Sequence, residues 1–308
     1  MADSHTVVMQ RTAWTAARML LALLVGLLAV LVWAYWSTLV LLHRDWGNDD
    51  NYSVGQLVPF AVLYLLWHDR ERLGQCRIKA CWWGVGVILV AQAARLFGLI
   101  QLFESAERYA FVLSIVGVVL LVAGWEVFWK SKWILLFLFL MLPLPGRIHN
   151  LISSPLQSNA TNGAVFSLEL LGVVVSNDGN VIVLNDTKEL AVAEACSGLR
   201  MLTAFVIVAA TLAYVVNRPQ WQKVVLVASS IPIAIMCNVA RLVATAFLFL
   251  MANNDELAER FFHDFAGLTM MPIAVAILMC ELWVMARLVI QDEPQSEYPG
   301  TSARTEQT

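Results

Sequence analysis

Long apolar stretches bounded by charged segments constrain this sequence more than any other feature. They fall at about residues 19–42, 54–67, 80–103, 109–129, 133–145, 197–216, 224–250 and 265–290. A predominantly apolar stretch of roughly 20 residues is long enough to cross a bilayer as a helix, and the first stretch is too long for the core of a signal peptide. We therefore expect an all-α membrane protein, a polytopic bundle of about eight transmembrane helices.

The composition excludes the main soluble classes of protein. Of the 308 residues, 59% are apolar and 14% are charged, whereas soluble domains typically have about 45–50% and about 25%. So few polar side chains cannot cover a soluble globule of this size. The net charge of −3 and the pI near 6.0 argue against a nucleic-acid partner. The five cysteines form no CxxC pair, and we expect neither a metal nor another cofactor.

The distribution of Lys and Arg predicts the orientation in the membrane. If the N-terminus is cytoplasmic, every loop that returns to the cytoplasm is basic, with Arg70, Arg72, Arg77, Lys79, Lys130, Lys132, Arg218 and Lys223. The opposite side has fewer basic residues spread over longer loops, namely Arg44, Arg108, Arg147, Lys188, Arg200 and Arg260. The positive-inside rule then predicts eight crossings with both termini in the cytoplasm, and places 43–53, 104–108, 146–196 and 252–264 on the outer face.

This orientation divides the chain into three parts. Residues 1–18 form a cytoplasmic N-terminus, 19–290 a transmembrane catalytic domain, and 291–308 a disordered cytoplasmic tail. Within the domain, about 146–195 is polar and is expected to form a small extracytoplasmic insertion. We expect a re-entrant or interfacial helix near 151–171 and a β-hairpin around Asn-Asp-Gly at 177–179. No internal repeat is evident, which weakens the hypothesis of an inverted-repeat transporter.

Cys196 is the one cysteine that this topology places at the outer interface. It lies in Glu-Ala-Cys-Ser-Gly-Leu-Arg at 194–200, just before the sixth predicted helix. Unpaired N–H groups and the dipole at a helix N-terminus favour a thiolate and could hold an oxyanion. Ser197 and Arg200 flank the motif's Gly198, which lets a substrate backbone approach closely. The alternative is a small interfacial residue without chemistry.

Arg241 lies inside an otherwise apolar stretch, in Asn-Val-Ala-Arg at 238–241. An arginine in a transmembrane helix costs several kcal/mol to insert, so it is expected to face the bundle interior and to have a function. Asn238 is one turn away on the same face. The alternative is a structural ion pair, for example with Glu126 or Glu281.

His263 begins the last predicted helix on the outer side, in His-Asp-Phe-Ala-Gly at 263–267. Asp264 either orients this histidine or caps the helix, and Gly267 allows close helix packing. The other outer histidines, His43 and His149, lack such a setting. These three residues together suggest a mechanism. Cys196 would attack a peptide carbonyl, Arg241 would stabilise the thiolate or oxyanion, and His263 would exchange protons with the thiol and the leaving amine.

Two further residues compete for these roles. Cys237 is a rival nucleophile because it is one turn from Arg241, although it lies deeper, where water for hydrolysis is scarce. Arg95 is a second intramembrane charge, which would either form an internal ion pair or bind a substrate carboxylate. We favour the structural interpretation of Arg95.

At these residues the sequence resembles the exosortase/archaeosortase family of integral-membrane cysteine transpeptidases. The resemblance covers roughly 55–290. It rests on Ala-Cys-Ser-Gly-Leu-Arg at 195–200, Asn-Val-Ala-Arg at 238–241 and His-Asp-Phe-Ala-Gly at 263–267, with support from Leu-Pro-Leu-Pro at 142–145 and Leu-Val-Pro-Phe at 57–60. It implies that Cys196 is the nucleophile and that Arg241 and His263 complete the site. The segment 43–53 differs from the Ser-His-Gly-like run that is usual before Leu-Val-Pro.

The family further implies a partner and a location. The substrates would be secreted proteins with a C-terminal sorting signal: a short motif (Pro-Glu-Pro in PEP-CTERM systems), a hydrophobic helix and a basic end. Cleavage would occur at the periplasmic face of the bacterial inner membrane, with transfer to a membrane-linked acceptor and often alongside exopolysaccharide machinery. Two other functions remain open: a non-enzymatic component of exopolysaccharide export, in which Arg95 and Arg241 line the path of an anionic lipid-linked glycan, and an anion transporter.

Overall fold

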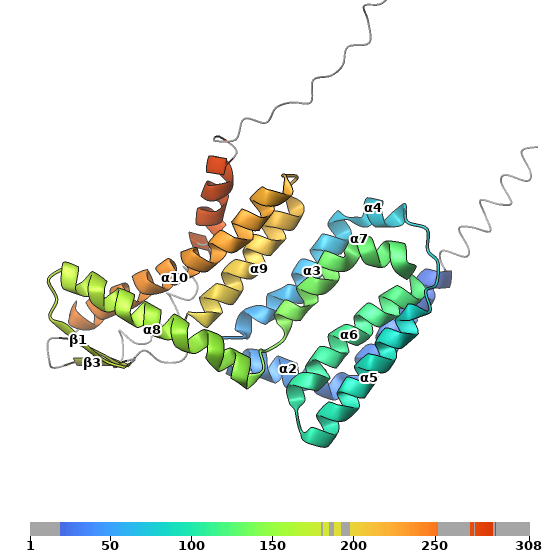
Figure 1. Ribbon diagram of the computed structural model, residues 1–308, viewed down its shortest axis with the longest axis horizontal. Coiled ribbons are helices and arrows are strands. Elements are labelled where there is room, and N and C mark those ends of the chain that lie inside the picture. The colour runs from blue at the N-terminus through green and yellow to red at the C-terminus, as the bar shows by residue number, and fades with distance from the viewer. Residues whose placement is uncertain are drawn as a thin grey trace, which may run out of the picture.

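The computed structural model describes residues 19–179, 181–184, 188–191, 198–251, 272–273, 275–285 and 287. Within them the protein is a bundle of helices with one small sheet at its edge (Figure 1). The helices in chain order are Met19–Ala34, α2 (Trp36–Asn48), the 3-10 turn η1 (Ser53–Gln56), α3 (Leu57–His68), α4 (Arg70–Gly74), α5 (Trp83–Gln101), α6 (Glu104–Val122), α7 (Gly124–Phe137), the 3-10 turn η2 (Leu138–Met141), α8 (Gly146–Leu170), α9 (Leu199–Val215), α10 (Gln220–Met251) and Val275–Met285.

The described helices confirm the class of helical membrane protein. By length and composition α5, α6 and α10 are able to cross a bilayer, and two bent pairs raise the number of candidate spans to as many as five. The pairs are Met19–Ala34 with α2, bent by 70°, and Gly124–Met141 with α8, bent by 82°. Every predicted apolar stretch contains a helix in the described part of the chain. The total of eight crossings stays a prediction.

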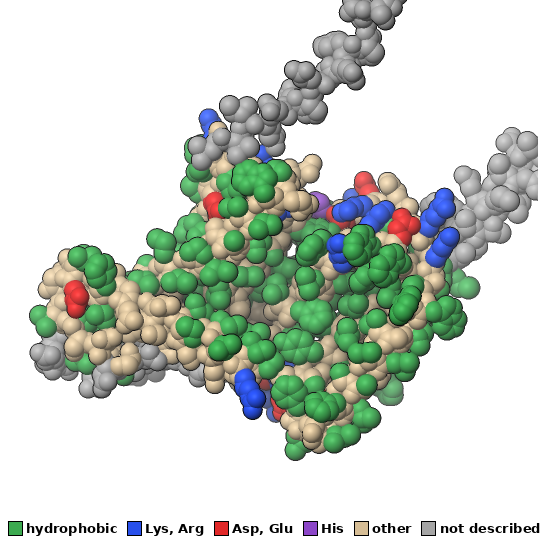
Figure 2. Space-filling model, viewed as in Figure 1, with side chains coloured by type: hydrophobic (Ala, Val, Ile, Leu, Met, Phe, Trp, Pro, Cys, Tyr) green, Lys and Arg blue, Asp and Glu red, His purple; other side chains and the backbone are tan. Residues whose placement is uncertain are grey.

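The surface agrees with a lipid environment. Figure 2 shows apolar side chains over most of the visible face, whereas charged side chains gather near α4 and α7 at one end and near the start of α8 at the other. Many of the exposed apolar side chains are large, such as Trp33, Phe60, Leu99 and Trp133. In water such a surface would cause aggregation, but in a bilayer it is the expected outer layer of a helical bundle.

The chain reverses between α6 and α7 at a point that the apolar pattern did not reveal. We expected one helix to continue to about residue 129 and a loop at Lys130 and Lys132, but α6 ends at Val122 and both lysines lie inside α7. Gly124 makes the turn with a φ of +89°, and a Cβ there would collide with the carbonyl of Lys79. A glycine is therefore required by a contact distant in sequence. The apolar residues on both sides of Gly124 concealed the break.

The polar insertion combines a long helix with a small sheet. α8 begins at Gly146, earlier than the expected 151, because Pro143 and Pro145 prevent the preceding helix from continuing. The predicted hairpin is present: β1 (Val175–Asp178) pairs antiparallel with β2 (Val181–Leu184), and Gly179 turns with a φ of +63°. A third strand, β3 (Lys188–Ala191), pairs with β2 and was not predicted. The extracytoplasmic position of the whole insertion stays a prediction.

Three apolar clusters hold the described elements together. The largest joins α2, α3, α6, α7 and α9. A second joins α8, β2 and α10, where Ile182 and Leu184 are fully buried. The third joins α9, α10 and Val275–Met285. As a consequence, the first turn of α9 lies where α8, α10 and the segment around η1 meet.

Candidate functional site at the start of α9

The first turn of α9 packs directly on α10 through a glycine. Gly198 precedes the helix with a φ of +85°, and its carbonyl accepts the first helical hydrogen bond, from the N–H of Leu202 (2.8 Å). A Cβ on Gly198 would lie 2.8 Å from Nδ2 of Asn238. Only a residue without a side chain permits both this backbone conformation and this approach. The structure thus joins two motifs that the sequence separates.

Asn238 and Arg241 are both buried on α10. Asn238 is 1% exposed and Arg241 is 7% exposed. They are three residues apart and therefore lie on neighbouring parts of one helix face. The prediction that Arg241 faces the interior is confirmed. The carboxylates suggested as its structural partners bind elsewhere, since Glu126 accepts from the backbone N–H of Arg77 (3.1 Å) and from Lys130 (3.3 Å), and Glu281 accepts from Ser229 (2.7 Å).

Arg200 connects α9 to the turn before η1. Its Nη1 lies 3.4 Å from Oδ1 of Asp50. This turn is ordered by its own hydrogen bonds: the N–H of Asn51 donates to Oδ1 of Asp49 (2.9 Å), and the hydroxyl of Ser53 donates to the carbonyl of Asp50 (2.8 Å). The loop before η1 therefore holds the Asp50 carboxylate beside the N-terminal end of α9.

His149 is a residue of this region that sequence reasoning set aside. It lies in the first turn of α8, is 7% exposed, and its Nδ1 shares a hydrogen bond with the hydroxyl of Tyr52. The two rings are also in tilted contact, with centroids 5.7 Å apart. The two residues are 97 positions apart, so no local pattern reveals the pair. We call the set Asp50, Tyr52, His149, Gly198, Arg200 and Asn238 the α9-start cluster.

The remaining predicted site residues lie outside the described part of the chain. They are Cys196, Ser197, His263, Asp264 and Gly267. Cys196 and Ser197 directly precede Gly198 in the sequence. Among the described residues, no group of three or more His, Cys, Asp or Glu side chains is placed to hold a metal ion.

Cys237 lies in surroundings that favour the structural interpretation. It is 8% exposed and belongs to the apolar cluster of α9, α10 and Val275–Met285, with Met201, Phe205 and Leu278. An apolar environment disfavours the thiolate, which is the nucleophilic form of cysteine. Cys237 is therefore a poorer candidate nucleophile than its closeness to Arg241 in sequence implies.

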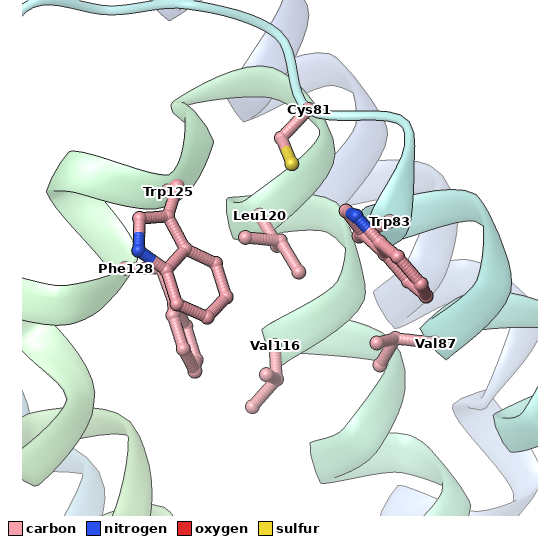
Figure 3. Close-up of a pocket in the computed structure, with 7 residues that line it drawn as sticks. All are labelled: Cys81, Trp83, Val87, Val116, Leu120, Trp125 and Phe128. Atoms are coloured by element: carbon pink, nitrogen blue, oxygen red, sulfur yellow. The ribbon is translucent and has the colours of Figure 1, made fainter.

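An open apolar hollow lies far from the α9-start cluster, between α5, α6 and the start of α7 (Figure 3). Its volume is about 670 Å³. It is lined by Cys81, by the aromatic side chains Trp83, Trp125 and Phe128, and by the aliphatic side chains Val87, Val116 and Leu120. The hollow offers no charged group and only one nucleophile, so it is not a plausible place for acyl transfer.

Taken together, these helices define a polytopic membrane protein with a polar cluster where α8, α9 and α10 converge. A family model described as transmembrane exosortase matches residues 46–280. The chain belongs to the transmembrane exosortase family. The match includes all three sequence motifs, and it supports a membrane transpeptidase-type role in general. A search of curated proteins and a search of solved structures gave no match.

Proposed function

We propose that the protein is a membrane-embedded cysteine transpeptidase that cleaves C-terminal sorting signals of the PEP-CTERM type from secreted proteins. Within the family assignment, the observation that carries the proposal is the packing of Gly198 on Asn238. Gly198 follows Cys196 by two residues, and Asn238 precedes Arg241 by three. This contact brings together Gly198 of the cysteine motif and Asn238 of the arginine motif, which supports a shared active site.

The proposed chemistry proceeds through a thioester. The Cys196 thiolate attacks the scissile carbonyl carbon, forming a C–S bond and a tetrahedral oxyanion that Arg241 stabilises. The C–N bond then breaks, and the leaving amine takes a proton from His263. An acceptor nucleophile attacks the thioester, gives its proton to His263, and releases the Cys196 thiolate. Atoms and charge balance over the two halves, and no cofactor is needed.

The start of α9 suits a thiolate nucleophile. The first N–H groups of a helix have no partner within the helix, and the dipole places partial positive charge there. Both effects lower the pKa of a nearby thiol. Gly198, as the residue before the helix, also lets this end of α9 pack closely on Asn238 of α10. Cys196 is thus in the sequence position where such effects act.

The exposed apolar helices support a membrane-borne substrate. A sorting signal with a hydrophobic helix would lie in the bilayer beside the bundle, and its short motif would reach the outer boundary at the depth of the α9-start cluster. The proposed location is the bacterial inner membrane with this cluster on the periplasmic side. Transfer to a membrane-linked acceptor and a connection with exopolysaccharide production belong to the same proposal.

The buried Arg241 also fits the two non-enzymatic functions, an exopolysaccharide-export component and an anion transporter, because both use an intramembrane cation. Only the transpeptidase needs Cys196. Replacement of that single thiol therefore separates the classes, whereas replacement of Arg241 would impair all three.

The test is a reporter protein that ends in a Pro-Glu-Pro motif, an apolar helix and a basic tail, expressed together with the chain. We expect processing of the reporter by the wild type, loss of processing in Cys196→Ala, and retention in the matched variant Cys237→Ala. Immunoblotting of the reporter and of the membrane-inserted enzyme measures both processing and enzyme level. Unchanged processing in Cys196→Ala at equal enzyme level would refute the proposed function.

A further inference from the structure

Arg95 lies within the membrane-length helix α5 and is not used by the proposed chemistry. By the rise of an α-helix, it is about 18 Å from Trp83 at one end of α5 and about 9 Å from Gln101 at the other. Its side chain is half-buried. A charge at this depth is costly unless it is neutralised or has a ligand.

Two contacts fix the guanidinium in place. Nη2 donates to the carbonyl of Ala34 (2.8 Å), and the guanidinium carbon lies 4.2 Å from the centre of the Tyr35 ring. Tyr35 is 1% exposed, and its hydroxyl accepts a hydrogen bond from Gln92 (3.1 Å) and lies 3.2 Å from Oγ of Ser114. Ala34 ends the first helix at the 70° bend, where carbonyl groups lack helical partners. Arg95 is therefore held rigidly at a helix terminus.

These contacts leave most of the charge without compensation. A helix C-terminus carries only about half a negative charge. Among the described residues no carboxylate forms an ion pair with Arg95, and its Nε is buried without a hydrogen-bond partner. Arg108 shows the contrast: it is more deeply buried, at 8% exposed, but it has Asp45 and Glu104 each at 2.8 Å. Within the described part of the chain, Arg108 is thus neutralised by carboxylates and Arg95 is not.

The surroundings of Arg95 define what kind of anion can reach it. The residues near Ala34, Tyr35 and Arg95 in the sequence include large, apolar and exposed side chains, namely Trp33, Trp36, Leu96, Phe97 and Leu99. A free inorganic anion would have to leave water and cross this apolar surface, which is unfavourable. An amphiphile covers the same surface with its chains and brings its own anionic group.

We propose that Arg95 binds the phosphate of a phospholipid whose acyl chains lie on these apolar side chains. A guanidinium donates two parallel hydrogen bonds to phosphate oxygens, and the Arg95 contacts with Ala34 and Tyr35 use only part of its five donors. The bend at Ala34 and Tyr35 would then be part of a lipid-binding site where the first helix, α2 and α5 meet. This inference is independent of the proposed transpeptidase, because it concerns a different part of the fold and requires no catalysis.

The test measures lipid retention on the intact protein by native mass spectrometry. Protein purified in detergent is titrated with phosphatidylglycerol, and in parallel with diacylglycerol of the same acyl chains. We expect retention of phosphatidylglycerol but not of diacylglycerol. Arg95→Gln should weaken phosphatidylglycerol binding by roughly tenfold, the effect of losing one charge-assisted hydrogen-bonding group, and Arg95→Lys should weaken it less.

Arg70→Gln is the matched control. Arg70 also donates to a backbone carbonyl, that of Trp67 (3.0 Å), and lies over that residue's ring at 4.6 Å, but it is at the end of a helix. Its loss should leave lipid retention unchanged. Equal retention by wild type and Arg95→Gln, or equal loss in Arg70→Gln, would overturn the proposal. If Arg95→Gln does not fold, the wild type alone still tests the proposal: retention of diacylglycerol as strong as that of phosphatidylglycerol would overturn it. Oleate binding as tight as that of phosphatidylglycerol would show a carboxylate site instead.

Discussion

Individual residues of the α9-start cluster form pairs across great distances in sequence. Tyr52 with His149 and Asp50 with Arg200 connect the turn before η1 to the first turns of α8 and α9. His149 is 7% exposed, and a buried polar group is costly unless it is hydrogen-bonded. The Tyr52–His149 pair therefore favours the arrangement in which α8 meets this turn. The Asp50–Arg200 pair is about one-third exposed and adds a weaker contact to the start of α9.

The Tyr52–His149 pair makes a testable contribution to stability. Tyr52→Phe removes the hydroxyl that bonds to the buried His149 and should lower the free energy of unfolding by about 1–3 kcal/mol, as should His149→Phe. The double variant should lose less than the sum of the single variants, because the bond is lost only once. Thermal denaturation in detergent, followed by circular dichroism, measures the effect. The control is Tyr64→Phe at an exposed site; strictly additive losses would contradict the coupling.

At the residue scale, the sequence predicted side-chain positions correctly where the residues concerned lie on one helix. Asn238 and Arg241 were expected on one interior face, and both are buried. It failed for His149, whose partner is 97 residues away. It also favoured an internal ion pair for Arg95, whereas the described contacts of Arg95 are a backbone carbonyl at a helix bend and an aromatic ring, which leave no sequence signature. The roles of Cys196 and His263 remain predictions.

At the scale of elements, glycines determine where helices approach or stop. Gly198 at the start of α9 and Gly124 at the start of α7 both have a positive φ. In both places a Cβ would meet a group from a distant segment, the Asn238 side chain and the Lys79 carbonyl. These contacts, and not the apolar pattern, fix the helix ends.

Gly198→Ala tests the importance of this helix start. The new methyl group would meet Nδ2 of Asn238, and the left-handed backbone would cost about 1–2 kcal/mol more for alanine. We expect a lower thermal midpoint and a loss of reporter processing that exceeds the loss of folded protein. Gly146→Ala is the control, because a Cβ at the start of α8 meets nothing within 4 Å. The interpretation fails if both variants behave like the wild type.

The sequence predicted the kinds of element better than their limits. Asn177, Asp178 and Gly179 indicated the hairpin, which forms with Asp178 opposite Val181. β3 was missed because Lys188–Ala191 has neither a clear alternation nor a turn signal of its own. The break at Gly124 was missed because apolar residues continue across it. A pattern of hydrophobicity reports burial in protein or lipid, but it does not report a contact made by a distant carbonyl.

For the whole molecule, the central prediction is the orientation in the membrane. Variants that each retain one cysteine are labelled in intact cells with a membrane-impermeant maleimide. We expect Cys196 to react from outside, with a pH midpoint below about 8.5 because its thiolate is favoured. Cys81, half-buried at the opposite end of the bundle, should react only after permeabilisation. Labelling of Cys81 from outside, with Cys196 protected, would show the inverse topology.

The most direct test of the proposed cysteine transpeptidase is capture of its covalent thioester intermediate. The purified protein is mixed with a sorting-signal substrate, quenched in acid, digested and analysed by mass spectrometry. We expect a thioester on the peptide that contains Cys196, removed by hydroxylamine and absent from Cys196→Ala, with no adduct on the peptide that contains Cys237. Cleavage of the substrate at an undiminished rate by Cys196→Ala, or an adduct on Cys237 instead, would contradict the proposed mechanism.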